Sequence, residues 1–435
     1  MFWILSQAAT PVVHNDDVLS NYMDVFYVSF VVSFIFTPIM RMIAIYFNII
    51  DEPDRVRKLH SEPIAYLGGL AVFLGWLTGV TLSQYLTLHR VDAGWPTVHP
   101  KVHFGIVLGA LIIVTLGLWD DVLKVRPKIK IIGQVMAAIC LLGDGVGARC
   151  GQSLVQPLVS RLAMSIAGIQ VIIPSWILML CSAVLVVGVV VGCCNASNLM
   201  DGLDGLCGGV TAIIAAGFLF LAVHLATVGG LVDANWDALR IILGLALLGA
   251  VLGFTPYNFN PASIFMGDTG SMFLGFACGT MIILMAQERA KWFLAAMVMF
   301  ALPILDTALA FTRRWINGRH LFSADRQHFH HQLVARGFTI RQTVLISYGL
   351  ATFFGLMGVA MVFLRTRYTL AIYLVIFGSI VVAAYKMGMV HENSIAPEPQ
   401  KPMDVPLDDY SQVIQPQVVM SVSGSSGGAR RISRT

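Results

Sequence analysis

The chain of 435 residues is 57% hydrophobic and only 12% charged, with a mean hydropathy of +0.77. Soluble domains carry roughly 25% charged residues, so a chain made of soluble domains is excluded. The formal net charge of +4 is too small at this length to indicate a nucleic-acid partner. We therefore predict an all-α, polytopic integral membrane protein whose surroundings are the lipid bilayer.

Apolar windows of near-spanning length predict eleven transmembrane helices. Their approximate ranges are 23–48, 65–86, 103–119, 129–146, 176–194, 207–225, 239–254, 271–286, 292–310, 343–363 and 368–388. We expect three regions: an external N-terminal segment (1–22), a transmembrane catalytic domain (23–390) and a tail (391–435). The tail is rich in Pro, Ser and Gly, a composition that predicts a disordered cytoplasmic segment.

The orientation of the helices follows from the basic residues of the loops. Lys and Arg concentrate after the first, third and ninth ranges, so the positive-inside rule places these loops in the cytoplasm. The N-terminus is then outside and the C-terminus inside. The five unusual polar stretches follow the first, third, fifth, seventh and ninth ranges. All five therefore fall on the cytoplasmic face, which predicts one shared active site there.

The polar stretch after the fifth range is NASNLMDGLDGL, residues 195–206. Asp201 and Asp204 are three residues apart and share one face if the segment is helical. Gly202 and Gly205 allow a ligand to approach the backbone closely. The alternative is a glycine-rich turn in which Asp204 caps the next helix. We interpret the stretch as one wall of a nucleotide and metal site.

The third range ends in the adjacent carboxylates Asp120 and Asp121. At a membrane boundary such a pair repels unless a cation or proton lies between its members. The functional interpretation is a magnesium-associated pair with one member acting as a base. The alternative is a solvated helix end that Lys124 and Arg126 neutralise.

The stretch YNFNPASIFMGDTGSMFLG, residues 257–275, places Asp268 just before the eighth range. Thr269 or Ser271 is expected to cap that helix, whose N-terminus favours phosphate. Phe265 lies three residues before Asp268, near enough for a base to stack on it while Asp268 holds a metal. The alternative for Phe265 is ordinary core packing.

The remaining stretches carry basic and imidazole groups. The segment ADRQHFHHQLVARG brings together up to four donors that could bind a diphosphate: Arg326, His328, His330 and His331. A zinc site and a solvated basic loop are the alternatives, and the HExxH spacing of a zinc enzyme is missing. Lys58 and His60, after the first range, are candidate phosphate or nucleotide contacts that positive-inside topology alone also explains. Asp306 is a further acid on this face, with Arg313 or Arg314 as expected partners.

In this order, RKLHSEP, WDD, NASNLMDGLDGL, NFNPASIFMGDTGS and DRQHFHHQL resemble the motifs of the polyprenyl-phosphate N-acetylhexosamine-1-phosphate transferase family. The resemblance extends from about residue 51 to 337. The DRQHFHHQL form is similar to the WecA-like branch, which transfers GlcNAc-1-phosphate to undecaprenyl phosphate. Phospho-MurNAc-pentapeptide transferases typically have three consecutive histidines here. The resemblance implies a multi-pass protein of the bacterial inner membrane, with its active site facing the cytoplasm and as a homodimer in some members.

The resemblance implies that a UDP-N-acetylhexosamine and undecaprenyl phosphate give a lipid-diphospho-sugar and UMP. This is the first membrane step toward a cell-envelope polysaccharide such as lipopolysaccharide O-antigen or a cell-wall polymer. Mg²⁺, with Mn²⁺ as a substitute, would screen the repulsion between the two phosphates. The implied metal ligands are Asp268 and Asp121, and Asp120 is implied to deprotonate or position the lipid phosphate. The residues leave the division between Asp120 and Asp121 open.

The other implied roles concern the sugar nucleotide. Phe265 is expected to stack on uracil, and Asn258 to support the same pocket. The residues expected around the nucleotide are Asn195, Asn198, Asp201 and Asp204. The residues expected at the diphosphate or sugar are Arg326, His328, His330 and His331, with Lys58 and His60 as further contacts.

Three other functions remain as alternatives. Phospho-MurNAc-pentapeptide transfer belongs to the same family. An ion-coupled transporter needs acids near the middle of the spans, whereas these acids sit at span ends on one face. A phosphatase acting on a lipid diphosphate leaves the predicted uridine pocket unexplained. The N-acetylated sugar and the oligomeric state stay open at this point.

Overall fold

A computed structural model describes residues 19–51, 64–89, 101–228, 234–318 and 328–386. The chain is a polytopic helical protein, as predicted, and each of the eleven predicted ranges contains a helix. Within the described residues, eight helices are long and apolar enough to cross a membrane, or nine if one bent pair counts as a span. The prediction of eleven crossings therefore stays a prediction, as does the disordered tail at 391–435, which lies outside the described residues.

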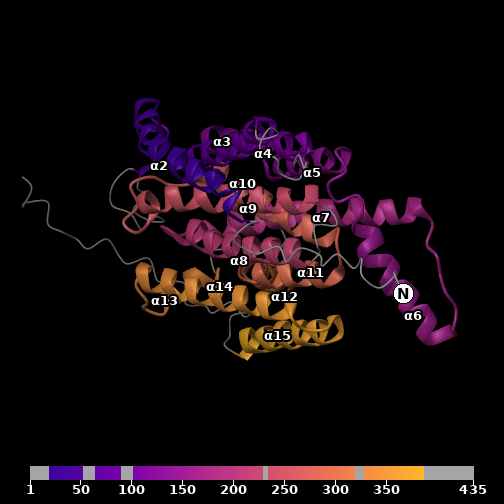
Figure 1. Cartoon of the computed structure of the whole chain (residues 1–435). Helices are drawn as coiled ribbons and strands as arrows, with labels where there is room; N and C mark the ends of the chain where they lie inside the picture. The colour runs from indigo at the N-terminus through magenta and orange to yellow at the C-terminus, as the bar shows by residue number, and fades with distance from the viewer. Residues whose placement is uncertain (1–18, 52–63, 90–100, 229–233, 319–327, 387–435) are drawn as a thin grey trace, which may run out of the picture. The chain divides into compact units, whose positions relative to one another are not determined.

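The elements follow one another from the N-terminal helix to the last apolar helix (Figure 1). In chain order they are α2 (Met23–Tyr46), β1 (Ile50–Asp51), β2 (Ile64–Ala65), α3 (Gly68–His89), α4 (Phe104–Leu123), α5 (Pro127–Gly143), the π-helical turn η2 (Gly151–Val155), α6 (Gln156–Ala167), α7 (Ser175–Met200), α8 (Leu206–Val228), α9 (Ala234–Asn258), α10 (Gly267–Ala286), α11 (Ala290–Met299), α12 (Ala301–Ile316), α13 (Phe329–Ala335), α14 (Ile340–Val362) and α15 (Thr366–Lys386).

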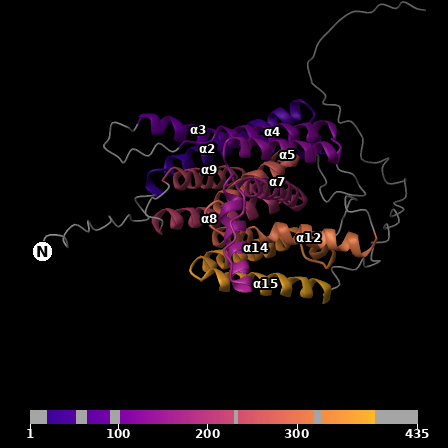
Figure 2. The same cartoon turned by 90° about the vertical axis from the view of Figure 1, so that its right-hand side faces the viewer.

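The helices pack side by side in an order that broadly follows the chain. Figures 1 and 2 both show α2 to α5 along one side of the bundle and α15 on the opposite side. The helices α7 to α10 lie between them, and α14 packs on α8 and α11. Helices at the two sides keep apolar faces outward, as residues in contact with lipid do.

Helix α10 is the centre of the bundle. It packs against α7, α4 and α3, and every one of its residues except Asp268 is buried. A helix that is apolar on all sides is buried on all sides, and GDTGSMFLGFACGTMIILMA has this composition. The single partly exposed residue of the central helix is therefore a carboxylate at its N-terminus.

Two short helices replace one straight span at the predicted range 292–310. Helices α11 and α12 meet at Phe300 with a bend of 74°. Pro303 lies in the first turn of α12 and has no N–H to continue the hydrogen bonds of α11, which explains the break at this point. The bend directs α12, and with it Asp306, toward the end of the bundle where α13 begins.

A small sheet fixes the loops on the same end of the bundle as the N-terminus of α10. Strands β1 and β2 are antiparallel, with Ile50 opposite Ala65, and Ala65 forms a parallel bridge to Ile264. This sheet ties the loop after α2 to the loop between α9 and α10. The segment that presents Phe265 is thus held on the start of α3.

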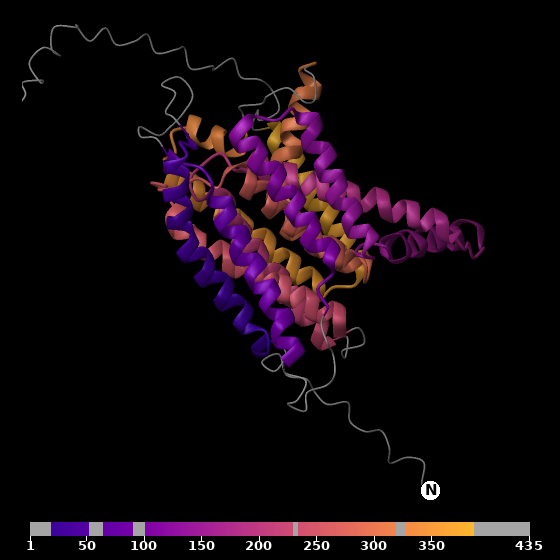
Figure 3. The same ribbon diagram turned by 90° about the horizontal axis from the view of Figure 1, so that it is seen from above.

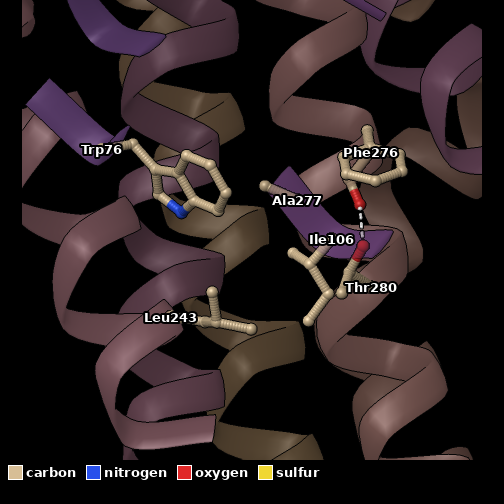
Figure 4. Close-up of a pocket in the computed structure, with 6 residues that line it drawn as sticks. All are labelled: Trp76, Ile106, Leu243, Phe276, Ala277 and Thr280. Carbon is tan, nitrogen blue, oxygen red and sulfur yellow. Dashed lines mark hydrogen bonds between the residues drawn. The ribbon is translucent and has the colours of Figure 1, made fainter. Parts of the chain in front are cut away.

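A small cavity lies between helices α3, α4, α9 and α10 (Figure 4). Its volume is about 10 Å³, which suits a single water molecule at most. The lining is mostly apolar, and Thr280 donates its hydroxyl hydrogen to the Phe276 carbonyl oxygen at 2.9 Å. The lining residues are Trp76, Ile106, Leu243, Phe276, Ala277 and Thr280. The cavity is too small for the sugar nucleotide that the motifs predict.

Helix α6 was not predicted, because its twelve residues are too few for a span and its apolar residues occupy one face only. It and the first turns of α7 extend away from the other helices (Figure 3). Gln156 fixes the return between α6 and α7, since its side chain donates to the Val171 carbonyl and accepts from the Ile173 N–H, both at 2.9 Å.

Candidate active site

Four of the five polar stretches meet at one end of the bundle. Asp120 and Asp121 occupy the last turn of α4, and residues 201–205 connect α7 to α8. The segment 259–266 leads into α10, and the histidines stand at the start of α13. The contacts between them show that these four stretches lie together, and their service as one active site stays a prediction. Lys58, His60 and Arg326 lie outside the described residues.

Lys130 joins two of the predicted catalytic carboxylates. Its Nζ atom lies 2.8 Å from Oδ2 of Asp120 and 2.5 Å from Oδ2 of Asp268. The lysine stands in the first turn of α5, and the other oxygen of Asp120 accepts a hydrogen bond from the Val125 N–H at 2.7 Å. One ammonium group therefore bridges two carboxylates that come from α4 and α10.

Sequence reasoning missed Lys130 because it counted this residue only among the basic residues that set the orientation. The one available signal was its place in the first turn of a helix that Pro127 begins, ten residues after Asp120. That signal does not separate a site residue from a solvated one. Only the approach of α10 to α4 and α5 makes the lysine part of the site.

Asp121 caps the N-terminus of α10 from a different helix. Its two carboxylate oxygens accept hydrogen bonds from the N–H groups of Asp268 (2.8 Å) and Thr269 (3.0 Å), and from the Thr269 hydroxyl (2.6 Å). A negative group at a helix N-terminus satisfies free N–H groups and the helix dipole. The expectation that Thr269 or Ser271 would cap this helix is wrong, because Asp121 already takes the cap position.

Gly267 makes the capping contact possible. Its backbone has a φ of +71°, which glycine adopts without strain, and a Cβ atom there would lie 2.6 Å from Oδ2 of Asp121. The glycine before Asp268 thus serves the turn and the close approach of Asp121. Both carboxylate oxygens of Asp121 already accept hydrogen bonds from the start of α10. Metal binding, which the sequence predicted for Asp121, is therefore less favourable there than at Asp120, and it stays a proposal.

Three residues that were expected around the nucleotide, and a fourth that was expected to support the pocket, hold the walls of the site together. Asn195 donates to the Gln134 side chain at 2.8 Å, and Asn198 donates to the Ser271 hydroxyl at 3.0 Å. These two bonds join α7 to α5 and to α10. Their amides lie at the site, and contact with a nucleotide stays a prediction for both.

The other two wall residues, Asp204 and Asn258, join the loop 201–205 to the loop 259–266. Oδ2 of Asp204 accepts from the Asn260 side chain (3.0 Å) and from the Ala262 N–H (3.1 Å). Asn258 accepts from the Gly205 N–H at 3.1 Å and donates to the Ile264 carbonyl at 3.0 Å. Asp204 therefore does not act as a cap for α8, the alternative that the sequence allowed.

Asp201 differs from these wall residues, because no described residue donates a hydrogen bond to its side chain. Burial raises the pKa of the Asp201 carboxyl well above its usual range, and the nearby carboxylates of Asp268 and Asp121 raise it further. A carboxyl group in such surroundings gains most from a cation or from a hydrogen-bond donor that a ligand brings. Asp201 is thus free to take part in binding.

Phe265 is held by its backbone and presents its ring at the site. Its N–H donates to the Ala65 carbonyl at 2.8 Å, and its carbonyl accepts from the Gly68 N–H at 3.0 Å. The ring is partly exposed and lies 5.9 Å from the Tyr66 ring, at a tilt of 56°. It is not a fully buried core residue, and its contact with a planar ligand stays a prediction.

The histidine cluster packs on Asp306. Oδ2 of this buried carboxylate lies 3.3 Å from Nδ1 of His328 and 3.9 Å from Nδ1 of His330. The expectation that Asp306 would pair with Arg313 or Arg314 did not anticipate these imidazole partners. The His331 ring lies beside the His330 ring, with 4.3 Å between ring centroids and a tilt of 50°, and it is only partly buried.

The described residues fit a magnesium ion through oxygen ligands. No group of three or more His, Cys, Asp and Glu side chains in the described ranges is arranged to hold a metal ion. Asp120 and Asp268, however, place one oxygen each within 2.8 Å of the same cationic atom. Magnesium commonly uses one or two carboxylates and completes its shell with water and phosphate oxygens, so these two suffice.

Comparison with known proteins identifies one matching family and several proteins of similar sequence. Residues 103–286, which include Asp120, Asp121 and Asp268, match a family described as glycosyl transferase family 4. The chain is 31% identical over 369 residues to a protein of Bacillus subtilis (strain 168), covering 84% of this chain and 92% of the relative. That protein is named "Probable undecaprenyl-phosphate N-acetylglucosaminyl 1-phosphate transferase".

Two further relatives are similar over most of their length. The "Decaprenyl-phosphate N-acetylglucosaminephosphotransferase" of Mycolicibacterium smegmatis is 33% identical over 334 residues, which are 73% of this chain and 76% of the relative. The "Phospho-N-acetylmuramoyl-pentapeptide-transferase" of Bacillus cytotoxicus is 28% identical over 323 residues, which are 71% of this chain and 87% of the relative. The similarity thus covers most of the helical part of the chain.

Proposed function

The chain belongs to glycosyl transferase family 4, as its motifs predicted, and we propose that it transfers N-acetylglucosamine-1-phosphate from a UDP-sugar to undecaprenyl phosphate. The products are a lipid-diphospho-sugar and UMP. The main observation behind the proposal is that Asp120 and Asp268 both contact Lys130. Two carboxylates and one ammonium group therefore lie together at one end of the helix bundle. The names of the relatives at 31% and 33% identity support the same reaction.

The chemical difficulty is that one phosphate anion attacks another. Asp268, with Asp120 or Asp121, would hold a Mg²⁺ ion, and such an ion would supply positive charge to screen this repulsion and to stabilise the leaving UMP. The Lys130 ammonium now contacts the two carboxylates. If a metal ion takes its place there, the ammonium is near enough to pair with a phosphate oxygen. Asp120 is placed to accept a proton from the lipid phosphate or to orient it. Mn²⁺ would fit the same carboxylates, since it accepts the same oxygen ligands.

The sugar nucleotide is proposed to bind across the loops that face these carboxylates. The uracil ring stacks on Phe265, and Asp201 receives a hydrogen bond from the nucleotide or sugar. Asn195, Asn198, Asp204 and Asn258 keep this pocket in shape. The remaining groups proposed for the diphosphate or sugar are Lys58, His60, Arg326, His328 and His331. His330, which the motif also suggested, is 2% exposed and is not proposed as a direct ligand.

The membrane arrangement is proposed from the charges of the loops. Eleven spans, with the N-terminus outside, place the site on the cytoplasmic face of a bacterial inner membrane. The acceptor lipid then reaches Asp120 sideways from the bilayer. The product serves a cell-envelope polysaccharide, and a homodimer is the proposed assembly.

Phospho-MurNAc-pentapeptide transfer is the second candidate, and the relative that is 28% identical supports it. Against it stands the sequence His-Phe-His-His at residues 328–331, where that branch typically has three consecutive histidines. The two candidates use the same chemistry with different donors, so a comparison of donors separates them.

A panel of UDP-sugars, assayed with purified protein, undecaprenyl phosphate and Mg²⁺, tests the proposal. We expect UMP release from UDP-GlcNAc that requires the lipid and stops when the metal is chelated. Release only from UDP-MurNAc-pentapeptide would assign the second candidate. Absence of UMP from every donor would reject both.

A further inference from the structure

Asp306 is a buried acid at the border of the site, and the proposed reaction gives it no role. It lies on α12 and is 4% exposed. Its Oδ1 accepts a hydrogen bond from the Phe329 N–H at 2.7 Å, at the start of α13. Its Oδ2 lies at ion-pair distance from Nδ1 of His328 and within 3.9 Å of Nδ1 of His330. One carboxylate therefore holds the start of α13 through a hydrogen bond, and its second oxygen packs beside two imidazole rings without a hydrogen bond to either.

His330 transmits this contact to the loop that carries Asp201. The ring is 2% exposed, and its Nε2 atom faces Gly202, where an added Cβ would lie only 2.3 Å away. Nε2 has no hydrogen-bond partner among the described residues, so the contact is one of packing. Gly202 itself is exposed, and the next residue back is Asp201. His330 thus forms a buried support beneath an exposed turn.

We propose that Asp306 is a positioning residue: acting through His330, it holds Gly202 in place and so sets where Asp201 meets the sugar nucleotide. The inference rests on the proposed function, because it gives Asp201 a ligand to meet. A buried carboxylate and a buried imidazole nitrogen without a donor both destabilise a fold, so neither is expected at a position that only fills space.

The alternative is that His330 binds the diphosphate directly as a cation. Its burial argues against this role, because the ring has almost no surface that a phosphate could reach. Burial and the neighbouring His331 lower the pKa of His330 to about 3, so the ring is neutral at neutral pH. A neutral, enclosed ring fits a support for Gly202 better than it fits a phosphate ligand.

The test compares kinetic constants of Asp306→Asn, which keeps an acceptor for the Phe329 N–H and removes the charge. We expect KM for UDP-GlcNAc to rise roughly 10- to 100-fold, because a displacement of about 1 Å at a binding group has effects of this size. KM for polyprenyl phosphate should stay within about twofold of the wild-type value. An equal rise in both constants, or no change in either, would overturn the proposal.

Gly202→Ala tests the same contact from the exposed loop, so a folding failure of the Asp306 variant does not leave the question open. The φ of Gly202 is not in the left-handed region, so alanine meets only the His330 ring. We expect the same selective rise in KM for UDP-GlcNAc. The double variant should be no worse than the more affected single variant, since both act through His330. An unchanged KM, or effects that multiply, would contradict the relay.

Asp144→Asn is the matched control. Asp144 accepts a hydrogen bond from the Gly105 N–H at 2.8 Å and faces Nδ1 of His103 at 3.5 Å, the same kind of contact at the opposite end of α4. This variant should leave both KM values unchanged. If the wild-type protein releases no UMP at all, the proposed function fails; if it does and Asp306→Asn matches it, only the positioning role fails.

Discussion

At the scale of single residues, Lys130 makes the most specific prediction. Its ammonium contacts the oxygens of Asp120 and Asp268 that the proposed metal ion would use, and in the proposed reaction it would also supply positive charge for a phosphate. Lys130→Gln should therefore lower the Mg²⁺ concentration for half-maximal activity while it reduces kcat roughly 100-fold. A magnesium titration of the UMP-release rate measures both quantities.

Lys128→Gln is the control for this prediction, because Lys128 is exposed on the same turn of α5. It should behave as the wild-type protein does. A higher magnesium requirement in Lys130→Gln, or an unchanged kcat, would mean that the lysine does not compete with a cation at this point.

His330 makes a prediction about pH. Its pKa is lowered from an ordinary value near 6.5 to about 3, chiefly by burial. Between about pH 3 and pH 6.5, His330 therefore binds a proton in the unfolded chain but not in the folded chain. The contribution of the neutral ring to stability is complete above about pH 6.5 and falls as the pH drops toward 3.

When the pH falls from 7.5 to 5, protonation of His330 in the unfolded chain should lower the free energy of unfolding of the wild-type protein by on the order of 2 kcal/mol. His330→Gln has no such group, so its thermal midpoint in detergent should depend less on pH over the same interval. If the variant and the wild-type protein lose equal stability over this interval, the ring is not held in its neutral form by burial.

At the scale of elements, the start of α10 depends on a cap that comes from α4. Gly267→Ala forces a side chain into the left-handed region, which costs about 1–2 kcal/mol, and pushes against Oδ2 of Asp121. Loss of the cap adds about 1 kcal/mol. We expect a lower thermal midpoint together with loss of most activity, because Asp268 is the next residue.

Gly188→Ala serves as the control for this element. Gly188 lies within α7 and has no atom within 4 Å of an added Cβ, so alanine should leave the thermal midpoint equal or slightly higher. If Gly267→Ala is as stable and active as this control, the Asp121 cap does not organise the start of α10.

The helices themselves were predictable because apolar windows of about twenty residues have few other uses. The contacts between helices were not. The sequence shows Asp121 beside Asp120, but not that one of them caps a helix 146 residues later while the other meets Lys130. The pairing of Asp306 with two histidines depends on the bend at Phe300, which length and hydropathy do not reveal.

The residues of the candidate site were predicted from the polar and glycine-rich motifs that contain them. Asp201 and Phe265 could be recognised because their glycine-rich or polar surroundings are unusual next to apolar runs. Asn195, Asn198 and Asp204 were recognised for the same reason, and the structure adds that they hold helices and loops together. A sequence pattern alone does not separate a residue that binds from one that supports.

At the scale of the whole molecule, the orientation in the membrane is a prediction. Lys128 and Arg289 are exposed at opposite ends of the helix bundle, at the start of α5 and just after α10. In a variant without the seven native cysteines, Arg289→Cys should react with a membrane-impermeant maleimide on intact cells. Lys128→Cys should react only after the membrane is permeabilised, and the reverse pattern would place the site on the outer face.

The central claim is that the phosphate next to the sugar travels with it to the lipid. UDP-GlcNAc that carries a radiolabel in this phosphate tests the claim directly, with undecaprenyl phosphate, Mg²⁺ and purified protein. We predict that the label moves into the organic-extractable lipid, with one unlabelled UMP released per labelled lipid, and that Asp268→Asn abolishes the transfer. Label that stays in water-soluble UDP while sugar reaches the lipid would contradict the account.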